Sequence, residues 1–161
     1  MFGLTSLGLV HTAISLVAVV AGAIALLRDK QIVTDNTIGQ VYIWTTALTC
    51  LTGFGIFQHG GFGKPHALGI ITLIVLAVAY AAGRYGAFGK RARYVEVIGY
   101  SLTFFFHWIP AITETTTRLP LGAPLLSSPD APQLQAASGV LFLLFLIGAF
   151  LQARRIKARS A

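Results

Sequence analysis

The sequence predicts an all-α integral membrane protein, a single helical bundle with five transmembrane helices. Hydrophobic residues make up 55% of the 161 residues and charged residues only 11%, whereas soluble domains are about 25% charged. The mean hydropathy is +0.75. A helix needs about 20 apolar residues to cross a bilayer, and five runs meet that need. They cover residues 4–27, 38–58, 66–86, 95–114 and 134–152, so we expect one transmembrane domain over residues 1–161.

The basic residues predict how the bundle is oriented. Ten of the twelve Lys and Arg fall at one end of the expected helices: Arg28, Lys30, Arg84, Lys90, Arg91, Arg93, Arg154, Arg155, Lys157 and Arg159. Only Lys64 and Arg118 fall at the other end. The positive-inside rule then puts the amino terminus outside and the carboxyl terminus in the cytoplasm, in a multi-pass protein of the cell inner membrane. Solvated charges at helix ends explain the net charge of +7 without nucleic acid as a partner, and the basic tail is suited to touch anionic lipid.

The first two runs carry inward-facing polar residues. In run 4–27, His11 shares a stripe with small residues, which let helices approach closely in lipid, so we expect it to face the bundle. In run 38–58, we expect Tyr42 and Trp44 at the cytoplasmic interface. A second face of that run carries Thr45, Thr49, Thr52, Ile56 and His59. Its threonines serve either helix packing or a ligand.

The turn at residues 59–66 is rich in glycine and ends at a proline suited to the first turn of a helix. It lacks the pattern of a phosphate-binding loop. The proline-rich residues 119–133 predict a second outer loop, and run 134–152 predicts an apolar anchoring helix. Cys50 is the only cysteine, which excludes an intramolecular disulfide.

Run 95–114 holds the strongest functional signal. One face of the expected helix carries residues at three- and four-residue steps that form a mainly polar stripe: Glu96, Gly99 or Tyr100, Thr103, His107, Pro110 and Glu114. Placing an ionisable side chain inside the bilayer costs free energy, so such a residue is usually kept for a function and predicts a functional site. The opposite face is aromatic and is expected to meet lipid or an apolar partner: Phe104, Phe105, Trp108, Ile109 and Ile112. Glu114 needs a partner near the helix end, which Arg118, a histidine or a metal would supply.

The histidines suggest a cofactor. His11 and His107 are both expected roughly 10 Å below the outer surface, on inward stripes of different helices. Bundles use such pairs to hold a b-type haem or a transition metal. His59 and His66 above them are candidate metal ligands, and Thr103, Glu114 and Arg118 are candidates for proton transfer or for supporting the site. The alternative is that each histidine only hydrogen-bonds a neighbouring helix.

The amino-terminal half resembles an uncharacterised family of small bacterial predicted membrane proteins. The residues that carry the resemblance are His11, the segment Gly22 to Leu26, the segment Gly39 to Tyr42, and the pair Gly60 and Gly61, over roughly residues 8–85. The family pattern has a histidine just before its second glycine, where this chain has Thr34, Asp35 and Asn36. The resemblance implies a helical membrane bundle and no established activity.

Three functions remain open from the sequence. The first is a binding or electron-transfer protein with haem or metal at His11 and His107. The second is an accessory or assembly subunit that binds other membrane proteins or forms a homo-oligomer. The third is a small proton-coupled transporter that uses Glu114 and His107. Hydrolase patterns such as HExxH and GxSxG are missing from the sequence, which makes hydrolysis the weaker prediction for an enzyme. Whether the protein is an enzyme stays open.

Overall fold

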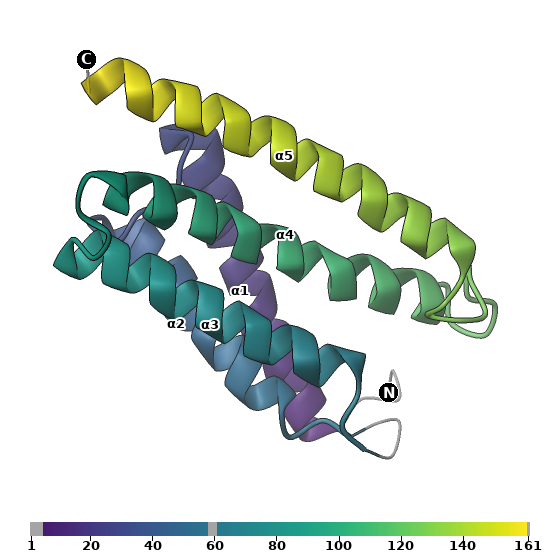
Figure 1. Cartoon of the computed structure of the whole chain (residues 1–161). Helices are drawn as coiled ribbons and strands as arrows, with labels where there is room; N and C mark the ends of the chain where they lie inside the picture. Colours follow the sequence, from purple (N-terminus) through teal and green to yellow (C-terminus); the bar gives the residue numbers. More distant parts are fainter. Residues whose placement is uncertain (1–4, 58–60, 161) are drawn as a thin grey trace.

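Five α-helices follow one another along the chain in the computed structural model, which describes residues 5–57 and 61–160. They are α1 (Ser6–Asp29), α2 (Thr37–Gly53), α3 (Lys64–Tyr85), α4 (Ala92–Arg118) and α5 (Pro132–Ser160), with a short 3-10 turn η1 (Gly89–Arg91) before α4. No strand occurs among these described residues. The all-helical prediction is therefore confirmed (Figure 1).

Within the described residues, four helical segments are long and apolar enough to cross a membrane, which indicates a membrane protein. They are Ser6–Asp29, Lys64–Tyr85, Gly89–Arg118 and Pro132–Arg159. α4 and α5 both extend beyond the predicted runs 95–114 and 134–152, because their ends are polar and carry no apolar signal. α4 also continues through Pro110 as one helix.

α2 is shorter than the predicted run 38–58. It begins after Asn36, whose side chain accepts a hydrogen bond from the Gly39 amide at 2.8 Å, and ends at Gly53. Beyond Gly53 the chain turns, with the Ile56 amide bonded to the Gly53 carbonyl at 3.1 Å. The residues after the helix are still apolar, so hydropathy alone placed the helix end too late. With 17 residues, α2 is about 26 Å long, slightly less than the roughly 30 Å hydrocarbon core.

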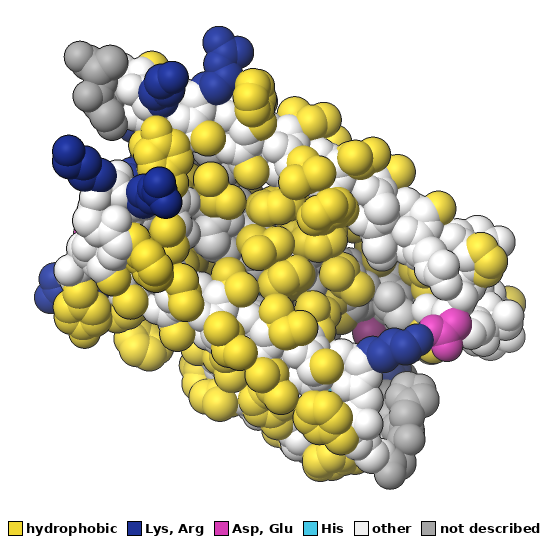
Figure 2. Space-filling model, viewed as in Figure 1, with side chains coloured by type: hydrophobic (Ala, Val, Ile, Leu, Met, Phe, Trp, Pro, Cys, Tyr) yellow, Lys and Arg dark blue, Asp and Glu magenta, His cyan; other side chains and the backbone are white. Residues whose placement is uncertain are grey.

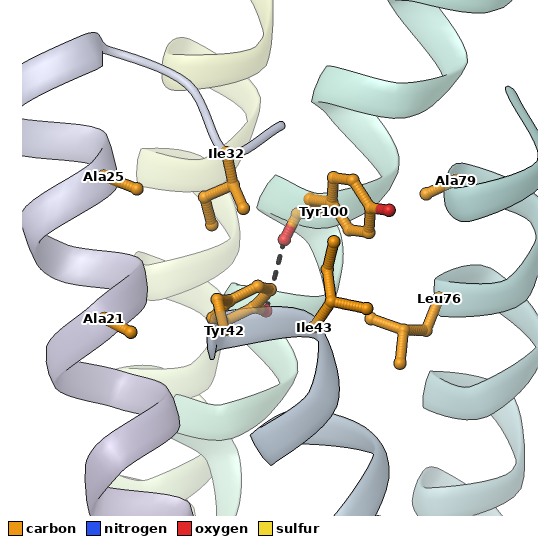
Figure 3. Close-up of a cluster of buried hydrophobic side chains, with 8 residues drawn as sticks. All are labelled: Ala21, Ala25, Ile32, Tyr42, Ile43, Leu76, Ala79 and Tyr100. Carbon is orange, nitrogen blue, oxygen red and sulfur yellow. Dashed lines mark hydrogen bonds between the residues drawn. The ribbon is translucent and has the colours of Figure 1, made fainter. Parts of the chain in front are cut away.

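α4 is the central helix of the bundle. α1 packs on α2, α3 packs on α4, and α5 packs on the other side of α4 (Figure 1). Tyr42 and Tyr100 lie at the centre of the largest buried cluster, among small and branched side chains (Figure 3). The rest of that cluster consists of Ala21, Ala25, Ile32, Ile43, Leu76 and Ala79.

The aromatic face of α4 meets other helices of the same chain over part of its surface. The Phe105 ring lies 5.7 Å from the Phe142 ring and 5.9 Å from the Phe145 ring, both on α5. Phe104 packs against Gly22 of α1, where an added methyl group would be 2.6 Å from the ring. Trp108 remains 37% exposed. Part of the aromatic face thus packs on α5 and α1 of the same chain, and contact of the rest with lipid stays a prediction.

The two ends of the bundle differ in charge. α1, α3 and α5 end where η1 and α4 begin, so the ten basic residues predicted to lie together fall at one end. Figure 2 shows Lys and Arg side chains gathered at the end that holds the carboxyl terminus, next to a broad apolar surface. At the opposite end, Lys64 pairs with Asp130 at 2.7 Å.

Candidate functional site

A row of seven polar side chains is buried between α4, α2 and the loop before α2. We call it the polar row: Thr34, Tyr42, Thr46, Glu96, Tyr100, Thr103 and His107, each no more than 8% exposed. The α4 members recur at three- and four-residue steps, so the helix turns all of them towards the bundle. The predicted polar stripe of α4 is therefore buried up to His107.

Glu96 forms the end of the polar row nearest the basic residues. One carboxylate oxygen accepts a hydrogen bond from the Thr34 amide at 2.8 Å, and the other pairs with the Arg93 guanidinium at 2.8 Å. The Thr34 hydroxyl continues the row to the Tyr100 hydroxyl at 3.0 Å. A buried carboxylate with only one partner would destabilise the fold, whereas this one has a charge partner and a backbone donor.

Gly83 of α3 makes room for this arrangement. A methyl group built at Gly83 would collide with the Glu96 carboxylate and with the Thr34 hydroxyl. Only a residue without a side chain lets α3 approach the buried carboxylate so closely.

Tyr42 and Thr103 form the middle of the polar row. The Tyr42 and Thr103 hydroxyls lie 2.7 Å apart. Both also point at the backbone carbonyl of Tyr100, at 3.4 Å from Tyr42 and 2.9 Å from Thr103 (Figure 3 draws the Tyr42 bond). Tyr42 is fully buried inside the protein, and its place at the membrane interface stays a prediction. The interfacial role fits Trp44, which is exposed.

His107 and His11 lie towards the end of the bundle opposite the basic residues, each beside a threonine of α2. His107 Nε2 lies 3.1 Å from the Thr46 hydroxyl, which in turn lies near the Tyr42 hydroxyl. His11 Nδ1 lies 3.1 Å from the Thr52 hydroxyl of α2. Each of the two histidines that the sequence singled out thus lies beside a threonine of α2.

The surroundings of the two histidines limit how a cofactor would bind. The nitrogen of His107 that is engaged by Thr46 would have to leave that hydroxyl before it could ligate iron or another metal. Within residues 5–57 and 61–160, no group of three or more His, Cys, Asp and Glu is placed to hold a metal ion.

His66 is separate from the polar row. It lies at the start of α3, where its Nδ1 accepts a hydrogen bond from the Gly63 amide at 3.2 Å. Its ring stacks between Phe57 and Phe62, with centroids 5.1 and 5.2 Å away. Its predicted partner His59 lies outside the described residues. The metal site at His59 and His66 stays a prediction, while the visible role of His66 is to cap and pack the helix start.

Glu114 and Arg118 form an ion pair one turn apart on α4. Because α4 continues to Arg118, the helix itself supplies the partner that Glu114 was expected to need. The Glu114 side chain is 54% exposed, so it lies outside the buried polar row. It is nevertheless close enough to His11 to interact with its charge.

Sequence reasoning missed three members of the polar row. Thr46 was passed over in favour of Thr45, whose hydroxyl bonds back to the Val41 carbonyl of its own helix at 2.6 Å. Tyr42 and Thr46 are four residues apart and share a face, which was the available signal. Thr34 lies in a loop, where no periodicity marks a buried residue.

Comparison with known proteins adds no assignment. No family model, curated protein or solved structure matches the chain. The resemblance over residues 8–85 to a family of bacterial membrane proteins therefore stays a prediction.

Proposed function

We propose that this protein moves protons across the membrane in which its helices lie, as a small proton channel or proton-coupled transporter. The observation that supports this function is the polar row, which runs through the bundle from Glu96 to His107. Ionisable residues inside a membrane are costly, and proton relays are one of the few functions that require them in a line.

The side chains of the polar row have the chemistry that proton transfer needs. Threonine and tyrosine hydroxyls each donate one hydrogen bond and accept others, and an imidazole takes up a proton at one nitrogen while it releases one from the other. Glu96 serves as the proton acceptor at the basic end. His107, His11 and then Glu114 serve at the other end, where Glu114 meets the solvent.

One junction interrupts the side-chain path. The Thr34–Tyr100 pair ends at the Tyr100 hydroxyl, whereas Tyr42 and Thr103 bond to the Tyr100 backbone carbonyl, which only accepts hydrogen bonds. A proton passes this point by way of a water molecule or by rotation of a hydroxyl group. We expect this junction to limit the rate of transfer.

The proposal includes five membrane crossings, with the amino terminus outside and the carboxyl terminus inside a bacterial inner membrane. α1 ends at the basic end and α3 begins at the other, so α2 must traverse the bundle despite its short length. The ten-to-two distribution of basic residues supports the orientation. Cysteines introduced at Ser127 and at Ala158, in a Cys50→Ala background, test it. An impermeant thiol reagent should label the first and not the second in intact cells, and the opposite result would reverse the orientation.

Proton flux into proteoliposomes tests the function. The purified protein is reconstituted with a pH-sensitive dye inside the vesicles, and a potassium gradient with valinomycin sets the voltage. We expect acidification above that of empty vesicles, at least tenfold slower with Glu96→Gln or His107→Gln. Thr45→Ala is the control, because the Thr45 hydroxyl bonds to carbonyls of its own helix and its loss should leave the flux unchanged.

The proposed function would be contradicted if vesicles that contain the protein showed no more proton flux than empty vesicles. This result would have to hold both with and without gradients of small molecules. The proposed function would also be contradicted if Glu96→Gln and His107→Gln both conducted protons as fast as the wild type and the Thr45→Ala control.

A second candidate function is electron transfer by a haem or transition metal held by His11 and His107. The position of both histidines beside threonines of α2, His11 on α1 and His107 on α4, supports it. A purified, coloured protein should then lose its Soret band in either His11→Ala or His107→Ala while it remains folded. If neither protons nor cofactors are found, the protein is better described as an accessory subunit of a membrane complex.

A further inference from the structure

A hollow of about 200 Å³ lies at the basic end of the bundle, away from the polar row's tyrosines and histidines. It is bordered by three arginines, one glutamine and one isoleucine: Gln31 before α2, Arg93 at the start of α4, and Arg155, Ile156 and Arg159 near the end of α5. We call it the basic hollow. Its volume has room for several water molecules, and therefore for one phosphate group.

The charges around the basic hollow are unbalanced. Arg155 and Arg159 are one helical turn apart on α5, and like charges at that spacing repel. Arg93 gives one amino group to Glu96, which leaves further N–H donors of its guanidinium for another acceptor. None of the described residues that line the hollow carries a carboxylate. An anion bound there would relieve the repulsion and accept hydrogen bonds from three guanidinium groups.

The type of side chain indicates which anion. Arginine presents planar, forked donors that match the oxygen atoms of a phosphate group. Gln31 adds an amide donor beside them. A phosphate ester therefore fits the basic hollow better than a small halide or a single carboxylate.

An apolar surface continues from the basic hollow along α5. Leu151 and Ile147 precede Arg155 by four and eight residues, so they lie on the same side of the helix, nearer the middle of the membrane. Both are exposed. Arg155 and Arg159 would thus hold a headgroup while acyl chains lie against this surface. Basic hollows between transmembrane helices on the cytoplasmic side are suited to anionic headgroups.

We propose that the basic hollow is a binding site for the phosphate group of an anionic phospholipid. The site ties the end of α5 to the start of α4 and to the loop before α2. It does not depend on proton movement through the polar row.

Lipid binding to the purified protein in detergent tests the site, with phosphatidylglycerol as the probe. Phosphatidylcholine and inorganic phosphate are the comparison ligands. We expect phosphatidylglycerol to bind and to raise the melting temperature, with little effect from the other two. If phosphatidylcholine stabilised the protein equally, the site would not be specific for an anionic lipid. If inorganic phosphate stabilised it equally, the ligand would be a soluble phosphate and not a lipid.

A matched pair of double variants locates the site. Arg155→Gln with Arg159→Gln removes two charges from the basic hollow, and Arg154→Gln with Lys157→Gln removes two charges from the same helix end outside it. The first pair should weaken phosphatidylglycerol binding on the order of tenfold or more, and the second by much less.

Equal losses in both pairs would mean a diffuse charge effect and would overturn the proposal. Circular dichroism establishes that each variant is folded. The preference of the wild type for phosphatidylglycerol over phosphatidylcholine gives a second measurement that needs no variant.

Discussion

The backbone amide of Thr34 donates a hydrogen bond of 2.8 Å to the carboxylate of Glu96, 62 positions later in the sequence. This bond fixes the loop between α1 and α2 onto the first turns of α4. Because the same carboxylate pairs with Arg93, one buried group holds a loop, a helix and a basic side chain together. A change at Glu96 should therefore disturb all three.

Removing the Glu96 carboxyl should destabilise the protein more than neutralising it. Glu96→Ala leaves the buried Thr34 amide without an acceptor and the partly exposed Arg93 without its partner, which costs about 1–3 kcal/mol. Glu96→Gln keeps an acceptor for the Thr34 amide and should cost less. Thermal unfolding in detergent measures both. Equal melting temperatures for Glu96→Ala and the wild type would show that the contact does not hold the fold.

Gly83→Ala should disturb the same site without changing a charge. The added methyl group meets the Glu96 carboxylate and the Thr34 hydroxyl, so we expect a loss of about 1–3 kcal/mol. Gly148→Ala in α5 is the control, because no atom of the described residues lies within 4 Å of a methyl group placed there. Alanine is the better helix former, so the control should be neutral or more stable. The prediction fails if both variants melt alike.

Tyr42→Phe should cost about 0.5–1.5 kcal/mol, since it removes the hydroxyl bonded to Thr103 and keeps the ring. Tyr85→Phe, at an exposed position near the basic end, serves as the control and should have little effect. Chemical denaturation of both variants beside the wild type gives the comparison. A Tyr42→Phe protein as stable as the Tyr85→Phe protein would argue against a buried bond.

Glu114→Gln should affect function more than stability. Its ion pair with Arg118 is partly exposed, and such i, i+4 pairs contribute about 0.3–0.5 kcal/mol. The melting temperature should therefore change little in Glu114→Gln and in Arg118→Ala. Proton flux should fall in Glu114→Gln, because Glu114 connects His11 to solvent in the proposed path. If the proton flux is unchanged in Glu114→Gln, Glu114 is not part of the proton path. The role of the polar row would then be tested by Glu96→Gln.

Periodicity predicted the helices and the inward stripe of α4, because apolar length and three- and four-residue spacing are local properties of the sequence. It also predicted that His11 and His107 face the bundle. It did not predict the burial of Tyr42 inside the protein, since a tyrosine near a helix end is also typical of a membrane interface. The burial of Thr34 could not be predicted from the sequence pattern, because it depends on a loop that folds back over α4. The end of α2 was misplaced because apolar residues continue past Gly53.

The Gln152 side chain of α5 accepts a hydrogen bond from the Ser101 hydroxyl at 2.9 Å and donates one to the Lys30 carbonyl at 3.0 Å. Ser101 lies on α4 and Lys30 directly follows α1, so one amide side chain joins α5 to two other helices. These two bonds fix both the rotation of α5 about its axis and its height along the bundle.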